Sequence, residues 1–254
     1  MLCGFSQGWL IMADDAAIIT LFNPLNGAHI QLPPVCPYDI IYDERSVRYV
    51  HKAILSSSPH CSSSDYNVLV ICGEQRELAY YNARTESWTE LQKEAGFYYE
   101  DIMSFKGELC AVDEYGKLVL INPNSSQKIK VIVEASLLEG QNLYLMDLFG
   151  KLCLIVRYRK IEDFQTYRFK VMLQLGGKWQ GVKGIGQCEV LLGYNRSMVL
   201  YATKVEGVLK DNRICFTDRR LVNNESRIGF ADGFEFGILY LEDYNMEQII
   251  VWSG

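Results

Sequence analysis

The residues that could form a catalytic site are few and lie far apart along the chain. Gly4-Phe5-Ser6-Gln7-Gly8 matches the G-x-S-x-G motif, in which a strand delivers a nucleophilic serine to a tight turn and a helix follows. Only three residues precede Gly4, and an apolar, strand-like run follows Gly8. We therefore interpret Ser6 as a loop residue that leads into a strand, and not as a nucleophile.

Metal-binding and cofactor-binding patterns are equally sparse. The chain has three histidines, His29, His51 and His60, and none has a second His or Cys at metal-ligand spacing. Cys61 directly follows His60, which makes it a poor chelating partner. Gly184-Ile185-Gly186 does not continue to the third glycine of a dinucleotide-binding loop. We expect no catalytic residue, no metal and no cofactor.

Adjacent acidic residues recur along the chain. Paired carboxylates can perform general acid–base catalysis when they share a cleft that separates their pKa values. Most of these pairs fall at expected turns, so we interpret them as solvated residues that shape the connection; the alternative is an acidic rim for a basic partner. The pairs are Asp14-Asp15, Asp43-Glu44, Glu100-Asp101, Asp113-Glu114 and Glu242-Asp243.

Aromatic residues make up 12% of the chain, and a role in packing is favoured over a role in binding. Trp9, Trp88, Trp179 and Trp252 fall in strand patterns, where we expect them to pack between sheets. Tyr98-Tyr99-Glu100 and Tyr194-Asn195-Arg196 lie near expected loops. Tyr and Arg at such places can anchor an interface, although turn or core roles are favoured. The sequence does not specify which residues would bind a protein.

Charge and cysteine content exclude several classes of protein. The net charge is −6 and the sequence pI is about 5.2, which disfavours nucleic-acid binding. The basic clusters are short, and we interpret both Arg157-Tyr158-Arg159-Lys160 and Arg219-Arg220 as solvated loop or strand-edge charges. Eight cysteines are scattered without a C-x-x-C, which predicts reduced core residues in a cytosolic or nuclear protein.

Membrane insertion is also disfavoured. The N-terminus lacks the basic region and long apolar run of a secretory signal. The stretch 16–38 carries no formal charge, but its Pro, Asn and Gln residues would leave polar groups unsatisfied in lipid. We expect a protein of the cytoplasm or nucleus.

The elements that must position these residues are short strands separated by turn residues. Six units of this kind can be distinguished, at 8–32, 66–91, 102–133, 143–182, 190–217 and 237–252, the fifth being weak. The alternating pattern that ends at Leu55 predicts a further strand there. Phe22-Asn23-Pro24, Tyr81-Asn82-Ala83 and Ile121-Asn122-Pro123 share an apolar residue followed by Asn. These asparagines are 59 and 40 residues apart, and this loose period brackets the roughly 40 to 50 residues of one four-stranded propeller blade.

This organisation predicts an all-β fold, namely a β-propeller of about five to six blades that forms a single domain over residues 1–254. Because the pattern starts close to Met1, an alternative is that the opening blade lacks its first strands.

Several strings, in this order, resemble the KIB-type domain of plant F-box proteins, a family with a DUF295-like domain of unknown function. They are Gly8-Trp9-Leu10-Ile11, the run from Leu21 to Pro33, the run from Lys52 to Pro59, and Gly107 to Asp113 with Gly116 after it; Trp179 sits in a further similar segment. The resemblance extends from about residue 5 to the C-terminus. It implies a substrate receptor of an SCF-type ubiquitin ligase, in which the propeller binds the protein target.

The chain departs from that family because no F-box helices stand before the propeller, and these would be needed to dock the ligase adaptor. The leading hypothesis is a non-enzymatic protein-recognition module whose target the sequence does not identify. The alternatives are an F-box-less propeller that binds without ubiquitin transfer and a truncated inactive product. A propeller hydrolase or lyase is a less favoured reading.

Overall fold

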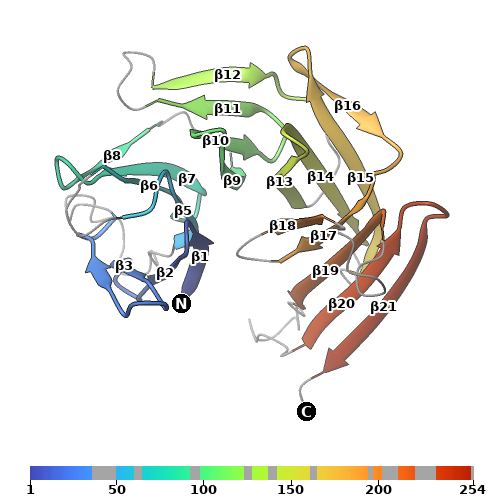
Figure 1. Ribbon diagram of the computed structural model, residues 1–254, viewed down its shortest axis with the longest axis horizontal. Coiled ribbons are helices and arrows are strands. Elements are labelled where there is room, and N and C mark those ends of the chain that lie inside the picture. Colours follow the sequence, from blue (N-terminus) through green and yellow to red (C-terminus); the bar gives the residue numbers. More distant parts are fainter. Residues whose placement is uncertain are drawn as a thin grey trace. The chain divides into compact units, whose positions relative to one another are not determined.

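The computed structural model describes residues 1–35, 50–59, 65–91, 98–122, 128–136, 142–160, 165–193, 197–201, 211–220 and 233–252. Every regular element within these residues is a β-strand. The chain divides into two compact units, Met1–Leu137 (unit 1) and Leu138–Gly254 (unit 2). Each unit is described by itself, with the strand labels of Figure 1.

Unit 1 contains three antiparallel sheets of four strands each, in the orders β1-β2-β3-β4, β5-β6-β7-β8 and β12-β11-β10-β9. The strands are β1 (Leu2–Ser6), β2 (Trp9–Ala13), β3 (Ile19–Phe22), β4 (His29–Gln31), β5 (Val50–Leu55), β6 (Asn67–Cys72), β7 (Glu77–Asn82), β8 (Ser87–Glu90), β9 (Tyr99–Phe105), β10 (Glu108–Asp113), β11 (Leu118–Ile121) and β12 (Ile129–Val133).

Two-residue turns join neighbouring strands at several places in unit 1. Gln7-Gly8 between β1 and β2 and Lys106-Gly107 between β9 and β10 both have positive φ at each position. This is the turn geometry that matches the right-handed twist of a hairpin, and glycine at the second position adopts it without steric cost. Antiparallel strands adjacent in sequence are therefore adjacent in each sheet.

The core of unit 1 lies between neighbouring sheets. One buried cluster combines residues of the first and second sheets, including Ile11, Ile19, Val68 and Val70. A second cluster combines the second and third sheets, including Leu69 and Ile102. The second sheet contributes to both clusters because alternate residues of β6 point to its opposite faces. A sheet buried on both faces explains why β6 is a continuous apolar run.

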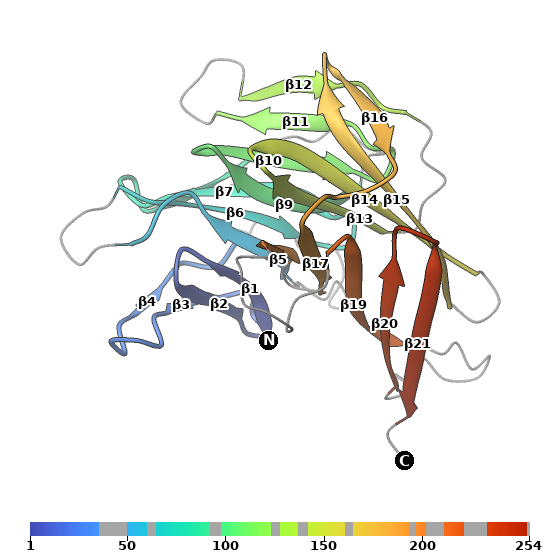
Figure 2. The same ribbon diagram turned by 45° about the vertical axis from the view of Figure 1, so that its right-hand side comes forward.

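Unit 2 contains two sheets. The fourth sheet has the order β13-β14-β15-β16, and the fifth has five strands in the order β18-β17-β19-β20-β21. Their bounds are β13 (Asn142–Leu148), β14 (Lys151–Arg159), β15 (Thr166–Leu175), β16 (Lys178–Val182), β17 (Cys188–Leu192), β18 (Ser197–Tyr201), β19 (Arg213–Arg220), β20 (Gly233–Tyr240) and β21 (Asn245–Trp252). Figure 2 shows the extended β19–β20–β21 portion of the fifth sheet.

The fifth sheet contains a parallel pair. β17 runs antiparallel to β18 and parallel to β19, with Glu189 opposite Arg213 and Leu192 opposite Phe216. Asn212 fixes the start of this pairing: its side-chain oxygen accepts the N–H of Ile185 at 2.9 Å, and its own N–H donates to the carbonyl of Cys188 at 2.9 Å. The loop before β17 and the residue before β19 are thereby held together.

The expected all-β propeller is confirmed, and its five sheets are five blades. The first four expected units match the first four sheets. The fifth and sixth units were wrongly separated, because β17 to β21 form one sheet. The opening sheet also has a strand that the sequence analysis did not distinguish, since Leu2–Ser6 is β1. That all of 1–254 forms a single domain stays a prediction.

Candidate protein-binding surface

Ser6 has a structural environment and not that of a nucleophile elbow. It is the last residue of β1, and antiparallel β2 follows after a two-residue turn. Its hydroxyl donates to the carbonyl oxygen of Leu55 at 3.3 Å and accepts the N–H of the same residue at 3.2 Å. A nucleophile elbow needs a helix after the serine. Ser6 instead joins the first sheet to β5 of the second.

The histidines are not brought together in the described residues. His29 begins β4 and is exposed. His51 lies in β5, where its Nε2 is 2.9 Å from the carbonyl oxygen of Gly73. Burial lowers the pKa of His51 below its usual range. His60 lies outside the described residues. No group of three His, Cys, Asp or Glu that could hold a metal occurs among the residues that the structure places.

Three of the acidic pairs shape turns as expected. Asp14 accepts N–H groups from Ala16 and Ile18 through one carboxylate oxygen. Asp113, the last residue of β10, does the same but is buried, so the expectation of a solvated residue is wrong there. Asp243 accepts one N–H between β20 and β21. In turns, the side chain of Asp usually accepts the backbone N–H of the residue two positions later. The pair Asp43-Glu44 lies outside the described residues.

The interpretation of Glu100-Asp101 as turn residues is wrong. Both lie in β9, which starts at Tyr99, three residues before the strand expected from the sequence. Asp101 is buried and forms an ion pair with Lys52 of β5, and Glu100 forms one with Arg76 after β6. Pairing with cations on the neighbouring sheet is what allows two acids to occupy a packed strand.

The basic cluster at 157–160 is also corrected. The side chain of Arg157 in β14 is fully buried, and not a solvated charge. Its Nε donates to Thr166 Oγ1 at 2.7 Å, and its guanidinium lies 4.7 Å from the centre of the Phe216 ring. A guanidinium stacks well on an aromatic face, so Arg157 joins the fourth sheet to the fifth. The side chains of Arg219 and Arg220 lie outside the described residues.

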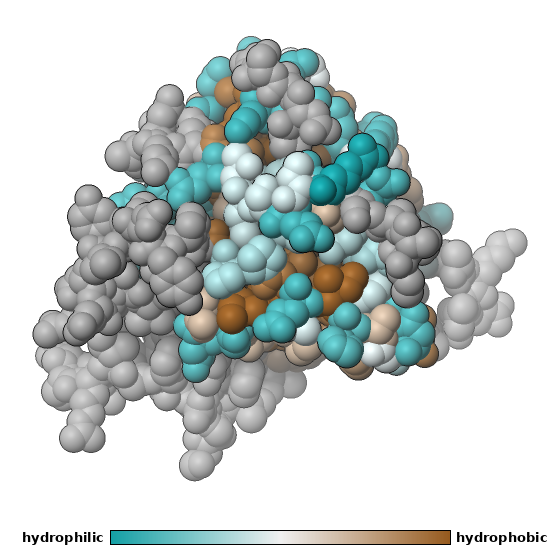
Figure 3. All heavy atoms as spheres, turned by 90° about the vertical axis from the view of Figure 1, so that its left-hand side faces the viewer, coloured by the Kyte–Doolittle hydropathy of each residue, from teal (hydrophilic) through white to brown (hydrophobic). Residues whose placement is uncertain are grey.

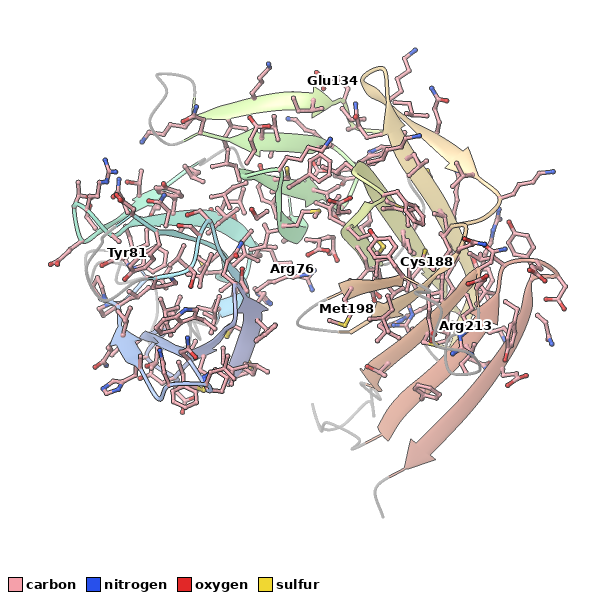
Figure 4. The ribbon with its side chains drawn as sticks, viewed as in Figure 1. Arg76, Tyr81, Glu134, Cys188, Met198 and Arg213 are labelled. Carbon is pink, nitrogen blue, oxygen red and sulfur yellow. The ribbon has the colours of Figure 1, made fainter. Side chains whose placement is uncertain are left out.

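A buried polar network on β17 and β19 was missed by the sequence analysis. The carboxylate of Glu189 accepts the thiol of Cys215 and the guanidinium of Arg213, each at 2.8 Å. Burial raises the pKa of Cys215 to about 12, and the adjacent carboxylate adds to the shift. The thiol is therefore a hydrogen-bond donor and not a nucleophile. Figure 4 labels Arg213 in this network and Cys188 on neighbouring β17.

Tryptophan packing between sheets is confirmed for two of the four residues. Trp9 is buried, and its indole N–H donates to the hydroxyl of Ser58, in the segment after β5 of the second sheet, at 3.2 Å. Trp88 in β8 donates to the carbonyl of Pro33 at 2.9 Å and packs on Tyr81. Trp179 lies half-buried in β16, and the side chain of Trp252 lies outside the described residues.

One exposed aromatic pair in unit 2 has the character of an interface anchor. Phe149 occupies the β13–β14 turn with φ of 52° and is 56% exposed, and Tyr201 at the end of β18 is 41% exposed. Their ring centres are 5.0 Å apart. The Tyr201 hydroxyl accepts the N–H of Phe149 at 3.3 Å and donates to the carbonyl of Asp147 at 3.4 Å. We call Phe149 and Tyr201 the Phe149 pair.

The geometry of the Phe149 pair explains how the rings are held. A positive φ is unusual for an aromatic residue, and it persists where the surroundings fix the backbone. The Tyr201 hydroxyl bonds the backbone on both sides of Leu148, and Gly150 N–H donates to Asp147 Oδ1 at 2.7 Å. Gly186 lies beside the Phe149 ring, since a Cβ there would be in ordinary contact with it at 3.6 Å. The hydrogen bonds of the β13–β14 turn thus hold both exposed rings in place.

The aromatic residues singled out from the sequence do not form this pair. Tyr98 is 39% exposed at the start of the third sheet, Tyr99 is buried, and the segment 194–196 lies outside the described residues. No local signal in the sequence shows that Tyr201, 52 residues after Phe149, lies against the β13–β14 turn.

The surface of unit 1 gives no comparable pair among its described residues. Among the residues coloured by hydropathy in Figure 3, hydrophilic ones predominate, with a smaller hydrophobic group between them. None of the described segments is a helix of the length and apolarity that crossing a membrane requires.

The sequence comparison decides the family. The family model described as KIB1-4 beta-propeller matches residues 1–241, nearly the whole chain. The chain belongs to the KIB1-4 beta-propeller family. These are propellers associated with plant F-box proteins, so the resemblance drawn from the sequence is confirmed. A comparison with curated proteins finds no match.

Solved structures similar to this KIB1-4 propeller are distant. A puromycin-hydrolyzing peptidase of Mycobacterium tuberculosis is 12% identical with a TM-score of 0.45; the match covers 100% of this chain and 36% of the peptidase. The Cps50 (Swd1) β-propeller domain of Myceliophteria thermophila is 12% identical with a TM-score of 0.46, covering 98% of this chain and 84% of that one. The WD40 domain of SCAP from fission yeast is 8% identical with a TM-score of 0.34, covering 97% and 61%.

Proposed function

We propose that this KIB1-4 propeller is a non-enzymatic protein-recognition module and that the Phe149 pair is part of its binding surface. The observation that carries the proposal is the exposure of two aromatic rings that the fold holds in place. Aromatic side chains are enriched among the residues that dominate binding energy at protein interfaces.

Prior ordering of the Phe149 pair favours binding. An interface side chain that must be ordered on binding costs about 0.5 to 1.5 kcal/mol. The hydrogen bonds between Tyr201 and the β13–β14 turn remove part of that cost, because the rings already contact each other. Aromatic residues with few rotatable bonds serve the same purpose in antibody binding sites.

The family context supports a finer proposal. A propeller associated with F-box proteins would act as the substrate-binding part of an SCF-type ubiquitin ligase in the cytoplasm or nucleus. Contact with the ligase adaptor would require an F-box, and the described residues contain only strands. Binding of the target and delivery of ubiquitin are separate steps, and the Phe149 pair concerns only the first.

The test compares proteins captured from plant extract by the full chain and by two matched variants. Phe149→Asn removes the exposed ring, and Asn tolerates the positive φ of this turn. Tyr244→Asn is the control, because Tyr244 lies in the β20–β21 turn with φ of 57° and the same 56% exposure. We expect a discrete partner to be retained by the control and reduced at least tenfold by Phe149→Asn, the loss of a typical interface anchor.

Equal capture by both variants would show that the Phe149 pair is not the binding surface. Tyr201→Phe refines the test, because it keeps the ring and removes the hydroxyl that bonds Phe149 and Asp147. We expect a smaller loss of binding than with Phe149→Asn.

A further inference from the structure

Three side chains gather on one face of the fourth sheet, at the end where β14 leads into β15. The Tyr158 ring of β14 lies 6.2 Å from the Tyr167 ring of β15, measured between ring centres. Cζ of Arg168 lies 5.5 Å from the centre of the Tyr158 ring. Tyr167 is 53% exposed, Arg168 is exposed and Tyr158 is half-buried. We call Tyr158, Tyr167 and Arg168 the Arg168 cluster.

A β-bulge in β15 brings the side chains of the Arg168 cluster together. Arg168 pairs with Tyr158, and Thr166 pairs with the next residue of β14, Arg159. Tyr167 is therefore an extra residue between the two pairs. Consecutive side chains of a regular strand point to opposite faces, whereas a bulge breaks this alternation and redirects a side chain. For this reason Tyr167 and Arg168, although consecutive, both contact the Tyr158 ring.

The contact with Tyr158 positions the Arg168 guanidinium and leaves it able to bind an acid. No carboxylate of the described residues forms an ion pair with Arg168. A cation–π contact holds a guanidinium in place without pairing its N–H donors with an acceptor oxygen. A guanidinium can form two parallel hydrogen bonds to one carboxylate, and such charge-assisted pairs are among the stronger hydrogen bonds. The Arg168 cluster therefore presents a positioned donor for a carboxylate.

The strands of the fourth sheet carry an excess of positive charge, although the net charge of the chain is −6. They contain one acidic residue, Asp147, which lies at the opposite end beside the β13–β14 turn. Their six basic residues are Lys151, Arg157, Arg159, Arg168, Lys170 and Lys178. Exposed Lys160 follows β14 and adds a charge at the end of the Arg168 cluster. Glu162 and Asp163 belong to the connection 161–164, which lies outside the described residues.

We propose that the Arg168 cluster is a docking site for an acidic segment of a partner protein, in which an Asp or Glu carboxylate pairs with Arg168 and a neighbouring apolar side chain packs on Tyr167. Arginine and tyrosine are enriched among the residues that dominate binding energy at interfaces. In an acidic chain, attraction between opposite charges directs such a segment to the basic sheet. At about 3.3 Å per residue, Tyr158 lies roughly 23 Å along β14 from Lys151, which follows the turn of Phe149. Binding here is therefore separate from binding at the Phe149 pair.

The test titrates the full chain with an acetylated peptide that carries glutamates around one leucine. In NMR spectra we expect the Arg168 Nε and Tyr167 amide resonances to shift on binding, and the affinity to fall as salt is raised. Arg168→Gln should weaken binding about tenfold or more, the loss expected for a central interface arginine. Lys178→Gln is the matched control, because it removes an exposed charge of the same sheet at the β15–β16 turn. Its affinity should stay within about twofold of the wild type.

The outcomes separate a specific site from general attraction between charges. Equal weakening by Arg168→Gln and Lys178→Gln would overturn the proposal, since any cation of the sheet would then serve. Failure of the peptide to bind the wild type, or binding without a shift at Arg168, would also overturn it. So would tighter binding of single-stranded oligothymidine, or of a peptide with phosphoserine in place of glutamate. Tyr167→Ser should weaken binding of the peptide and leave binding unchanged when alanine replaces its leucine.

Discussion

Gly237 shows how one missing side chain determines packing in unit 2. A Cβ at this position in β20 would lie 2.3 Å from Cζ of Phe216, the ring on which Arg157 stacks. The Phe216 ring is fully buried and cannot move aside freely. Overpacking of this kind typically costs 1 to 3 kcal/mol.

We therefore expect Gly237→Ala to lower the free energy of unfolding by about 2 kcal/mol in urea denaturation. Gly181→Ala in β16 is the matched control, because a Cβ there would meet only the Lys170 side chain at 3.9 Å. The control should change stability by less than about 0.5 kcal/mol. Equal stability of both variants would contradict the close contact with Phe216.

Residues such as Arg157 and Asp101 could not be placed from the sequence. Charged residues are seldom fully buried, so short charged stretches are reasonably interpreted as surface. The partners that reverse this interpretation, Phe216 for Arg157 and Lys52 for Asp101, lie 59 and 49 residues away. Nothing local in either stretch indicates such a partner.

At the scale of elements, β9 brings an unfavourable charge into the packing between two sheets. The pKa of Glu100 is about 7 in the folded chain and 4.5 when unfolded, so the folded chain binds the proton more tightly. Ionisation of buried Glu100 therefore lowers the free energy of unfolding. This effect is absent below pH 4.5, grows as the pH rises and is complete above pH 7, where the free energy of unfolding is lower by about 3 kcal/mol.

Glu100→Gln, which resembles the protonated acid, should therefore unfold with a free energy about 1 to 3 kcal/mol larger than the wild-type at pH 8. At pH 5 the two should be nearly equal. Urea denaturation at both pH values measures this, with Glu108→Gln, at the exposed first residue of β10, as the control. A variant less stable than the wild-type at pH 8 would mean that the ion pair with Arg76 exceeds the cost of burial.

Most strands could be predicted because their apolar runs end at turn residues. β10, β11 and β12 coincide with the expected strands of 102–133 to within a residue. The fifth sheet could not be predicted, since its parallel neighbours are not adjacent in sequence. β19 pairs with β17, although β18 lies between them along the chain. Alternation and turn chemistry describe hairpins and say little about such pairings.

At the scale of the whole molecule, the described cysteines are distributed through both units. Six of them are described, and each is a buried thiol: Cys3, Cys72, Cys110, Cys153, Cys188 and Cys215. Burial raises the pKa of Cys110 and Cys153 to about 12, and thiols in this state react slowly because the thiolate is the reactive form. The expectation of reduced core cysteines is confirmed for these six.

We expect iodoacetamide at pH 8 to leave these six cysteines unmodified in the native chain and to modify all of them in urea. Site-resolved mass spectrometry measures each one separately, and the urea sample is the control for reactivity. Rapid native modification of Cys153, which is fully buried in β14, would contradict the packing of unit 2.

The parallel pairing of β17 and β19 sets an order of assembly. The β17–β18 and β20–β21 hairpins each close over a few residues, so each can form as soon as its own segment leaves the ribosome. The β17–β19 contact joins segments more than twenty residues apart, so it closes a longer loop than either hairpin does. Pairing of β17 with β19 is therefore the slow step in building the fifth sheet, because it must unite strands that no short turn connects.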